Sequence, residues 1–179
     1  MVYVMLGTGF EEIEALAPVD LMRRAGIEVL TVGINGKIVS GGRRIGVQAD
    51  ITMDQMDLTN LEMIVLPGGL GGVASIRASE PTLDAVRFAY ENDRFVAAIC
   101  AGPTVLADLG ITSGRHATCF PGQACNMKDA VLEEKAFVRD GKIITGASAG
   151  CAVEFGLALI DALRGPEASE QIRNQIVIR

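Results

Sequence analysis

The sequence predicts a three-layer α/β sandwich with a mostly parallel sheet, and two observations support this. Short apolar runs typical of buried strands alternate with helix-like stretches of roughly 10–15 residues, the pattern of a parallel sheet covered by helices on both faces. The chain has 179 residues, whereas a barrel of eight such units needs roughly 250. Because no linker, internal repeat or low-complexity segment interrupts the pattern, we expect a single domain over residues 1–179.

The expected elements follow in order along the chain. Each expected strand is short, rich in β-branched residues and bounded by turn residues. These strands are residues 2–6, 28–32, 37–40, 63–66, 95–99, 116–120, 136–139 and 142–145. The turn signal Asn35-Gly36 makes 37–40 part of a small antiparallel excursion. The expected helices are residues 11–25, 80–92, 101–107, 149–163 and 167–174. This order corresponds to a sandwich of the flavodoxin-like type.

Composition disfavours several classes of function. The net charge of −6 and the pI near 4.8 disfavour binding to nucleic acid or to an anionic membrane. No apolar run approaches the ~20 residues of a membrane helix, and residues 2–6 are a first strand rather than a signal peptide. The 4 cysteines have no CxxC spacing and the chain has 1 histidine. We therefore expect a cytoplasmic protein with reduced thiols, no disulfide framework and no structural zinc site.

Cys100 is the strongest candidate for chemistry. It lies between the apolar run 95–99 and a helix-like stretch in which Pro103 suits a first turn. A buried, inert thiol is one interpretation, since most free cysteines pack as small hydrophobic residues. The other is a thiol on a tight strand-to-helix turn, where the N-terminus of the helix favours the thiolate and gives Cys100 a pKa below ~7.

Four strand ends carry residues suited to a site at one edge of the sheet, where ligands bind in open α/β sheets. They are residues 7–14, 67–69, 100 and 146–150. Glu11 and Glu12 fit a solvated first helical turn. Glu14 lies about 200° from Glu12 around the helix and could face Cys100 as a hydrogen-bond donor or as a base. The glycines of 67–69 form either a tight connecting turn or a loop that presents N–H groups to a substrate oxygen.

Four segments in this order resemble the ThiJ/PfpI superfamily. They are FEEIEA at 10–15, VLPGG at 65–69, AAICAGP at 97–103 and EFGLALIDAL at 154–163. The resemblance is strongest to the branch that holds the Parkinson-disease-associated deglycase and its bacterial ThiJ/YajL relatives. It implies a cytoplasmic homodimer with neither metal nor organic cofactor.

The resemblance also implies roles for individual residues. Cys100 matches the reactive, oxidation-prone cysteine, and Glu14 matches the acidic residue that hydrogen-bonds it. Gly69 and Ala101 match the backbone donors of an oxyanion pocket, with Gly68 beside them. Arg43, from GGRRIGV, matches an arginine near the dimer interface, and we include it among the candidate substrate-binding residues.

One departure from the family pattern concerns histidine. Better-known members have a histidine just before a proline near the cysteine, where this chain has Phe120, as its YajL-like relatives do. His116 is expected at a strand edge. Ala101 stands where the protease-like branch has histidine, which argues against a Cys-His peptidase. Glu14 is therefore the one proton-transfer group we expect beside Cys100.

The three other cysteines have lesser expected roles. Cys119 and Cys125 are expected to pack on a strand and a loop, although a secondary redox role for either stays open. Cys151, at the start of the helix expected over 149–163, is the second candidate for a reactive thiol.

Two functions use the same residues. The first is an enzyme in which the Cys100 thiolate attacks a 2-oxoaldehyde such as methylglyoxal or glyoxal, or its adduct on a glycated protein, and Glu14 moves the proton. The second is a non-catalytic oxidative-stress sensor or chaperone whose Cys100 oxidises to sulfinic acid. The sequence does not choose between them.

Overall fold

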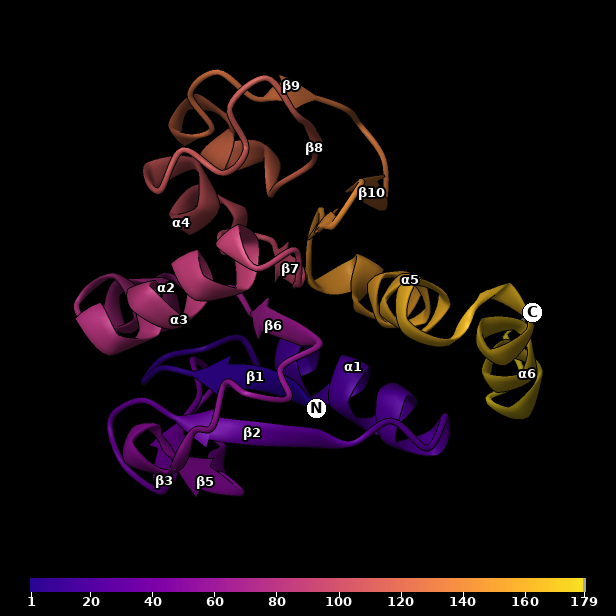
Figure 1. Cartoon of the computed structure of the whole chain (residues 1–179), viewed down its shortest axis with the longest axis horizontal. Helices are drawn as coiled ribbons and strands as arrows, with labels where there is room; N and C mark the ends of the chain where they lie inside the picture. The colour runs from indigo at the N-terminus through magenta and orange to yellow at the C-terminus, as the bar shows by residue number, and fades with distance from the viewer. Residues whose placement is uncertain (179) are drawn as a thin grey trace.

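A seven-stranded sheet runs through the centre of the molecule (Figure 1), which is described over residues 1–178 by a computed structural model. The strand order is β10-β11-β7-β6-β1-β2-β5, and only the pair β10–β11 is antiparallel. The strands are β1 (Val2–Leu6), β2 (Val29–Gly33), β5 (Ile51–Thr52), β6 (Met63–Leu66), β7 (Phe95–Ile99), β10 (Phe137–Asp140) and β11 (Ile143–Gly146). Every residue of β1, β6 and β7 is buried, as expected for parallel strands covered on both faces.

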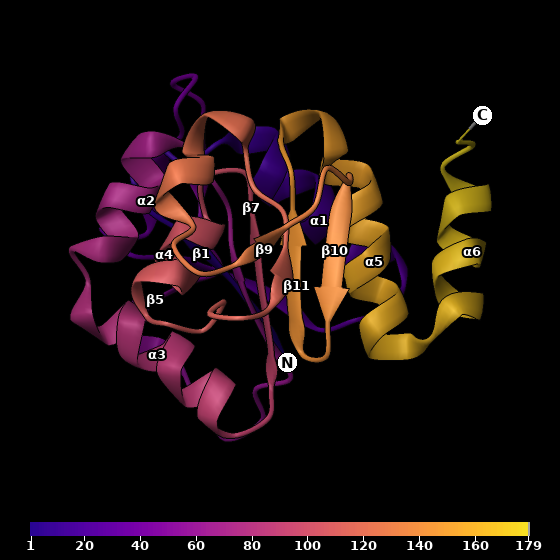
Figure 2. The same ribbon diagram turned by 90° about the horizontal axis from the view of Figure 1, so that it is seen from above.

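Helices cover both faces of this sheet (Figure 2), which confirms the predicted three-layer sandwich. On one face lie α1, α5 and α6, and on the other lie α2, α3 and α4. Their bounds are α1 (Glu12–Arg24), α2 (Leu70–Arg77), α3 (Glu80–Glu91), α4 (Pro103–Asp108), α5 (Ala152–Arg164) and α6 (Pro166–Gln175). The sequence analysis did not predict α2, because two glycines near its start lower its intrinsic helix propensity. Burial of Val73 and Ile76 stabilises it instead.

Residues 38–40 form part of a small antiparallel pair as expected, but the expected position of its turn at Asn35-Gly36 is wrong. Strand β3 (Ile38–Ser40) pairs in antiparallel fashion with β4 (Gly46–Gln48), so the reversal lies at residues 41–45. Asn35 has another role, because its side-chain Oδ1 accepts a hydrogen bond from the Thr8 N–H at 3.1 Å. This hydrogen bond connects the residues after β2 to the loop after β1.

The expected strand 116–120 is shorter in the structure. Only β8 (His116–Ala117) is a strand, and it pairs in parallel with β9 (Val131–Leu132). The following residues leave this ladder because they bond elsewhere. The Thr118 N–H donates to Thr145 Oγ1 at 2.8 Å, and the Phe120 N–H donates to the Cys100 carbonyl at 2.9 Å. Short 3-10 turns complete the fold: η1 (Met53–Gln55), η2 (Pro121–Asn126) and η3 (Ala149–Cys151).

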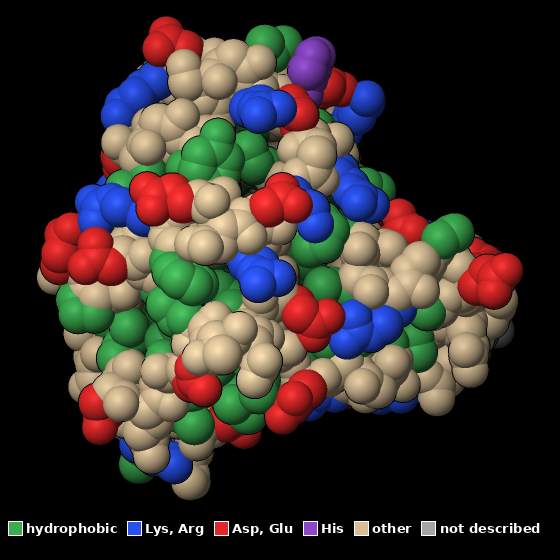
Figure 3. Space-filling model, in the orientation of Figure 1, with side chains coloured by type: hydrophobic (Ala, Val, Ile, Leu, Met, Phe, Trp, Pro, Cys, Tyr) green, Lys and Arg blue, Asp and Glu red, His purple; other side chains and the backbone are tan. Residues whose placement is uncertain are grey.

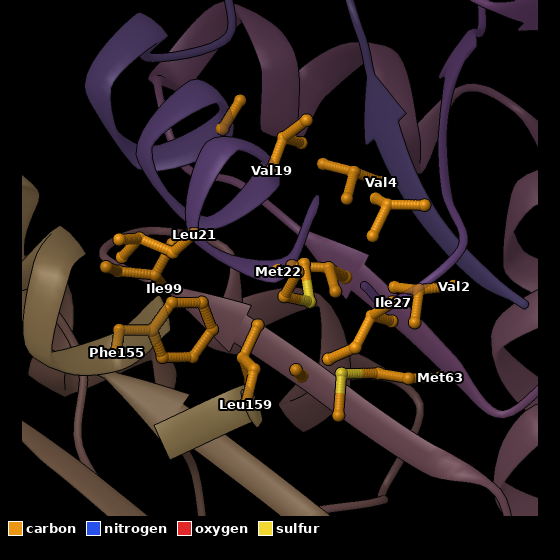
Figure 4. Close-up of a cluster of buried hydrophobic side chains, with 14 of the residues drawn as sticks. Val2, Val4, Val19, Leu21, Met22, Ile27, Met63, Ile99, Phe155 and Leu159 are labelled. Atoms are coloured by element: carbon orange, nitrogen blue, oxygen red, sulfur yellow. The ribbon is translucent and has the colours of Figure 1, made fainter. Parts of the chain in front are cut away.

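The sheet separates two apolar clusters. The one beneath α1 and α5 contains Val4, Leu21, Ile99, Phe155 and Leu159, whose side chains converge in Figure 4. The second lies under α2, α3 and α4. Close packing on both faces fixes the sheet, and with it the relative positions of the strand ends.

The surface is mixed in charge. On the face shown in Figure 3, Lys and Arg side chains lie among Asp and Glu side chains. Among residues 1–178, no helix combines the length and apolarity needed to cross a membrane.

We expect Phe155→Ala to lower the free energy of unfolding by about 3–5 kcal/mol, the usual cost of removing a fully buried aromatic side chain. Phe155 is 0% exposed and packs closely enough that a Cβ at Gly146 would lie 2.9 Å from its ring. Chemical denaturation measures the change. Phe137→Ala, at a residue 38% exposed, is the control and should cost clearly less; equal losses would contradict the packing described here.

Candidate functional site

The ends of β1, β6, β7 and β11 meet at one cavity of about 560 Å³, as predicted. The loop after β1 contributes Gly9 and Glu11, and α1 contributes Glu14. Gly69 follows β6, Cys100 follows β7, and residues 148–150 follow β11. The cavity is also lined by residues from the β3–β4 turn, the start of α2, the residues just before α4, and the residues just before and within η2 (Pro121–Asn126): Gly42, Arg43, Leu70, Gly71, Ala101, Phe120 and Gln123.

Cys100 occupies the tight turn between β7 and α4 that was expected for it. Its φ of 64° is unusual for a residue with a side chain, and such backbone strain persists only where neighbours fix it. The Cys100 N–H donates to the Gly146 carbonyl at 2.9 Å, and its carbonyl accepts from the Phe120 N–H at 2.9 Å. The thiol is partly exposed at the cavity, so a small electrophile can reach it.

Glu14 faces Cys100 from the first turns of α1, as the resemblance implied. Its side chain is 0% exposed, and Oε2 accepts a hydrogen bond from the Gly68 N–H at 2.9 Å. The Glu14 Oε1 atom is buried and has no hydrogen-bond partner among residues 1–178, and the Cys100 thiol lies beside the carboxyl. Burial raises the pKa of Glu14 to about 7, while the interactions with Cys100 and the Gly68 N–H act in the opposite direction. A carboxyl with this pKa can both take and give a proton at neutral pH.

The sequence predicted a pKa below ~7 for Cys100. That prediction is wrong when Glu14 beside the thiol is ionised. Burial and the negative charge of Glu14 raise the pKa of Cys100 to about 12, and only the Ala101 N–H acts to lower it. The helix contributes little because α4 begins at Pro103 and has 6 residues. The pair therefore loses its first proton near neutral pH and keeps the second over a wide range.

Two glycines shape the floor of the site. A Cβ at Gly68 would lie 2.8 Å from the Cys100 Cβ, so no larger residue fits there. The Gly68 N–H is already bonded to Glu14, and Gly68 thus positions the carboxyl instead of serving as the substrate-binding donor we expected. Gly69 and Ala101 do line the cavity, and Gly69 has a φ of 83° that favours glycine.

The acidic residues before Glu14 differ from the expected solvated turn. Glu12 is 6% exposed, and its Oε1 accepts from the Arg43 N–H at 2.8 Å, which ties the β3–β4 turn to α1. Glu11 lies in the cavity wall, 3.4 Å from the guanidinium of Arg43. Arg43 therefore reaches the candidate site, with a side chain that is 73% exposed.

The single histidine lies away from the thiol. His116 is exposed in β8, and its Nδ1 is 2.8 Å from Glu133 Oε1. Phe120 does line the cavity, at the position that the family resemblance indicated. Glu14, by contrast, is a titratable side chain that acts directly on the Cys100 thiol.

The other thiols lie outside this cavity. Cys119 is buried, which raises its pKa, and Cys125 is exposed. Cys119 and Cys151 line a second cavity of about 690 Å³. All four cysteines are free. Within residues 1–178, no cluster of three or more His, Cys, Asp or Glu side chains is arranged to hold a metal ion.

Sequence reasoning missed Leu70 and Gln123 as wall residues and Glu12 as the anchor of the β3–β4 turn. The acidic run gave no signal that distinguishes a buried Glu12 from a solvated one. Leu70 follows the glycine loop directly, and only the orientation of α2 brings it to the cavity.

Comparison with known proteins agrees with this geometry. Residues 1–162 match the DJ-1/PfpI family. Protein dj-1beta of Drosophila melanogaster is 34% identical over 178 residues, covering 98% of this chain and 95% of that protein. A crystal structure of Drosophila melanogaster DJ-1beta superposes with a TM-score of 0.95 and 33% identity, over 99% of this chain and 97% of that one.

Two further relatives bear on chemistry. Glutathione-independent glyoxalase DJR-1.2 of Caenorhabditis elegans is 29% identical over 166 residues, covering 90% of this chain and 87% of that protein. The structure described as Toxoplasma gondii DJ-1, oxidized, superposes with a TM-score of 0.93 and 29% identity, over 98% of this chain and 97% of that one.

We expect the alkylation rate of Cys100 to rise with pH through a midpoint near 7, where the pair with Glu14 loses its first proton. A thiolate can form only after that loss. Iodoacetamide labelling at a series of pH values, read by mass spectrometry, measures the profile.

The matched control is Glu14→Gln, which preserves size but removes the shared proton. In this variant the step near pH 7 should disappear from the Cys100 profile. Labelling of the exposed Cys125 in the same samples corrects for reagent chemistry. An unchanged step in Glu14→Gln would show that the two groups do not titrate together.

Proposed function

We propose that this chain, which belongs to the DJ-1/PfpI family, is a cofactor-independent glyoxalase or protein deglycase. Its substrates would be 2-oxoaldehydes such as methylglyoxal and glyoxal, or their adducts on proteins. The observation that carries the proposal is the buried Glu14 carboxyl, with a pKa raised to about 7, beside a Cys100 thiol that faces a cavity. The glyoxalase name of the Caenorhabditis elegans relative supports it.

The first step is addition. Sulfur of the Cys100 thiolate bonds to the aldehyde carbon, and the π electrons of that carbonyl move to its oxygen. The oxygen takes up a proton, which gives a hemithioacetal. N–H groups of Gly69 and Ala101 at the cavity wall would stabilise the negative charge that develops on this oxygen.

The second step moves a proton between two carbons. Glu14 as the carboxylate takes the proton from the former aldehyde carbon, and the electron pair passes through an enediolate toward the ketone carbon. Glu14 then returns the proton to that second carbon. One carbon is oxidised to a thioester while its neighbour is reduced to an alcohol, so no external oxidant or reductant is required. A carboxyl with a pKa near the working pH suits both transfers.

Water completes the cycle. It attacks the thioester carbon, the carbon–sulfur bond breaks, and a 2-hydroxy acid leaves while Cys100 regains its proton. For methylglyoxal the product is lactate. The same sequence applied to an aminocarbinol adduct would release a repaired side chain, with the amine as leaving group in the first stage.

A second candidate function is supported by the oxidized Toxoplasma gondii neighbour. In this sensor function, hydrogen peroxide transfers one oxygen to the Cys100 thiolate and leaves as water, and a second peroxide converts the sulfenate to a sulfinate. Neutral Glu14 would donate a hydrogen bond to the sulfinate oxygen. A changed partner binding or chaperone activity would be the output.

The Glu14→Gln variant separates the two functions. We expect it to lower the turnover of methylglyoxal to lactate by about 10²–10⁴-fold, since an amide cannot exchange the proton, while Glu14→Asp retains part of the activity. Enantiomer-resolved lactate analysis measures this, and Cys100→Ser exposes contaminating activity. Wild-type turnover in Glu14→Gln would rule out the proton shuttle, whereas absent turnover in the wild type together with peroxide oxidation of Cys100 favours the sensor.

We also propose that the chain acts as a cytoplasmic homodimer. Its free thiols suit a reducing compartment. Ile13 on α1 is 50% exposed, and Ile45 in the β3–β4 turn is 54% exposed. Ile13 follows Glu12 in α1, and the N–H groups of Ile45 and Arg43 both donate to Glu12 Oε1, so we infer that these two exposed isoleucines belong to the interface.

Light scattering of the wild type should give about twice 18.9 kDa. Ile45→Asp places a charge at this interface and should shift the mass toward one chain, because an unpaired charge at an apolar interface is costly. Ile38→Asp, at a residue 78% exposed on β3, tests whether the interface extends along the strand. A single-chain mass for the wild type would remove the dimer and with it any role for Arg43 across an interface.

A further inference from the structure

Two large apolar side chains stand exposed beside the Cys100 thiol. Leu70 is 73% exposed and Phe120 is 45% exposed, and both line the cavity that holds Cys100 and Glu14. Exposed apolar surface inside a concave site is the feature that ligand pockets share. The chemistry proposed above uses neither side chain.

Both side chains are held in place by their backbones. Leu70 opens α2 immediately after Gly69, whose positive φ sets the direction of that helix. Phe120 donates its N–H to the Cys100 carbonyl at 2.9 Å, which fixes it next to the nucleophile. Its ring lies against Gly122, where a Cβ would be 3.0 Å from the ring Cε1. The ring thus lies close to the start of η2, and Phe120 also lines the cavity.

The cavity is larger than a three-carbon aldehyde requires. Its volume of about 560 Å³ falls in the range of pockets that enclose drug-sized ligands, whereas one water takes ~30 Å³ in the liquid. Polar side chains in the wall include Glu14, Gln123 and Ser148, and the charges of Glu11 and Arg43 are directed at each other. Leu70 and Phe120 are the large apolar side chains of the wall.

We propose that Leu70 and Phe120 form an apolar subsite for the substituent on the ketone carbon, so that the protein prefers aryl or branched-alkyl 2-oxoaldehydes over glyoxal. This substrate preference rests on the proposed function. With the aldehyde carbon at the Cys100 sulfur, the adjacent ketone carbon carries its substituent away from Glu14 and along the cavity wall. Burial of that substituent against Leu70 and Phe120 removes apolar surface from water on both sides.

The test compares phenylglyoxal, which has an aryl substituent, with glyoxal, which has none. The wild type should show a kcat/KM ratio that favours phenylglyoxal by about tenfold or more, the discrimination that an apolar pocket gives. Leu70→Ala and Phe120→Ala should each lower this ratio several-fold, and Phe120→Leu should retain part of it. The matched control is Leu132→Ala, a leucine 42% exposed in the second cavity, which should leave the ratio unchanged.

A labelling experiment tests the subsite without turnover. The rate of Cys100 modification by N-benzyliodoacetamide is divided by the rate with iodoacetamide, and the same quotient at the exposed Cys125 serves as the internal reference. The wild-type quotient should be higher at Cys100 than at Cys125, and it should fall in Leu70→Ala and Phe120→Ala but not in Leu132→Ala.

The outcomes separate the two proposals. Equal quotients at Cys100 and Cys125, or a Cys100 quotient that neither variant changes, would overturn the apolar subsite. A benzyl preference at Cys100 that both variants reduce supports the subsite even if no aldehyde is turned over, and in that case only the glyoxalase function fails. Turnover of both aldehydes without preference would keep the enzyme and reject the subsite.

Discussion

A buried carboxyl is the constraint on which the site depends. Glu14 has no exposed surface, and a buried polar group is costly unless it is hydrogen-bonded. Its Oε2 accepts from the Gly68 N–H after β6, whereas its Oε1 has no hydrogen-bond partner among residues 1–178, and the Cys100 thiol after β7 interacts with the same carboxyl. One side chain thus connects α1 to the glycine loop and lies beside the strained turn at Cys100. The same burial raises the pKa of Glu14 to about 7, so structural and chemical roles share one cause.

The three glutamates at the start of α1 have different partners, although they are close in the sequence. Glu11 lies in the cavity wall near Arg43, Glu12 turns away to bind the β3–β4 turn, and Glu14 points to the thiol. Glu12 and Glu14 are both buried, and of the two it is Glu14 that interacts with the Cys100 thiol. The β3–β4 turn carries Arg43 to the cavity because Glu12 accepts its N–H. Helix α1 thereby positions Glu14 beside Cys100 and, through Glu12, positions Arg43 at the edge of the cavity.

The thiol is controlled by its neighbours more than by a helix. The short α4 starts beyond Cys100, so the only main-chain donor that acts on the thiol is Ala101. Proton sharing with Glu14 then governs when a thiolate forms. Phe120 supplies an apolar side chain to the cavity wall. In the function we propose, Glu14 carries the acid–base chemistry and the apolar wall residues determine substrate fit.

The sequence by itself determined the layer order, the central strands, the Cys100 turn and the meeting of Glu14, Gly69 and Cys100. Apolar runs of strand length bury on both faces, and a parallel sheet brings their carboxyl ends to one edge. Only the tertiary structure decided the register of β3 with β4, the burial of Glu12, the role of Gly68 and the arrival of Leu70 at the cavity. It also reversed the expected pKa of Cys100. These features depend on contacts between segments that are distant in the chain. Local helix and strand propensity and hydrophobic periodicity do not indicate which distant hydrogen-bond donor or charge will lie next to a given side chain.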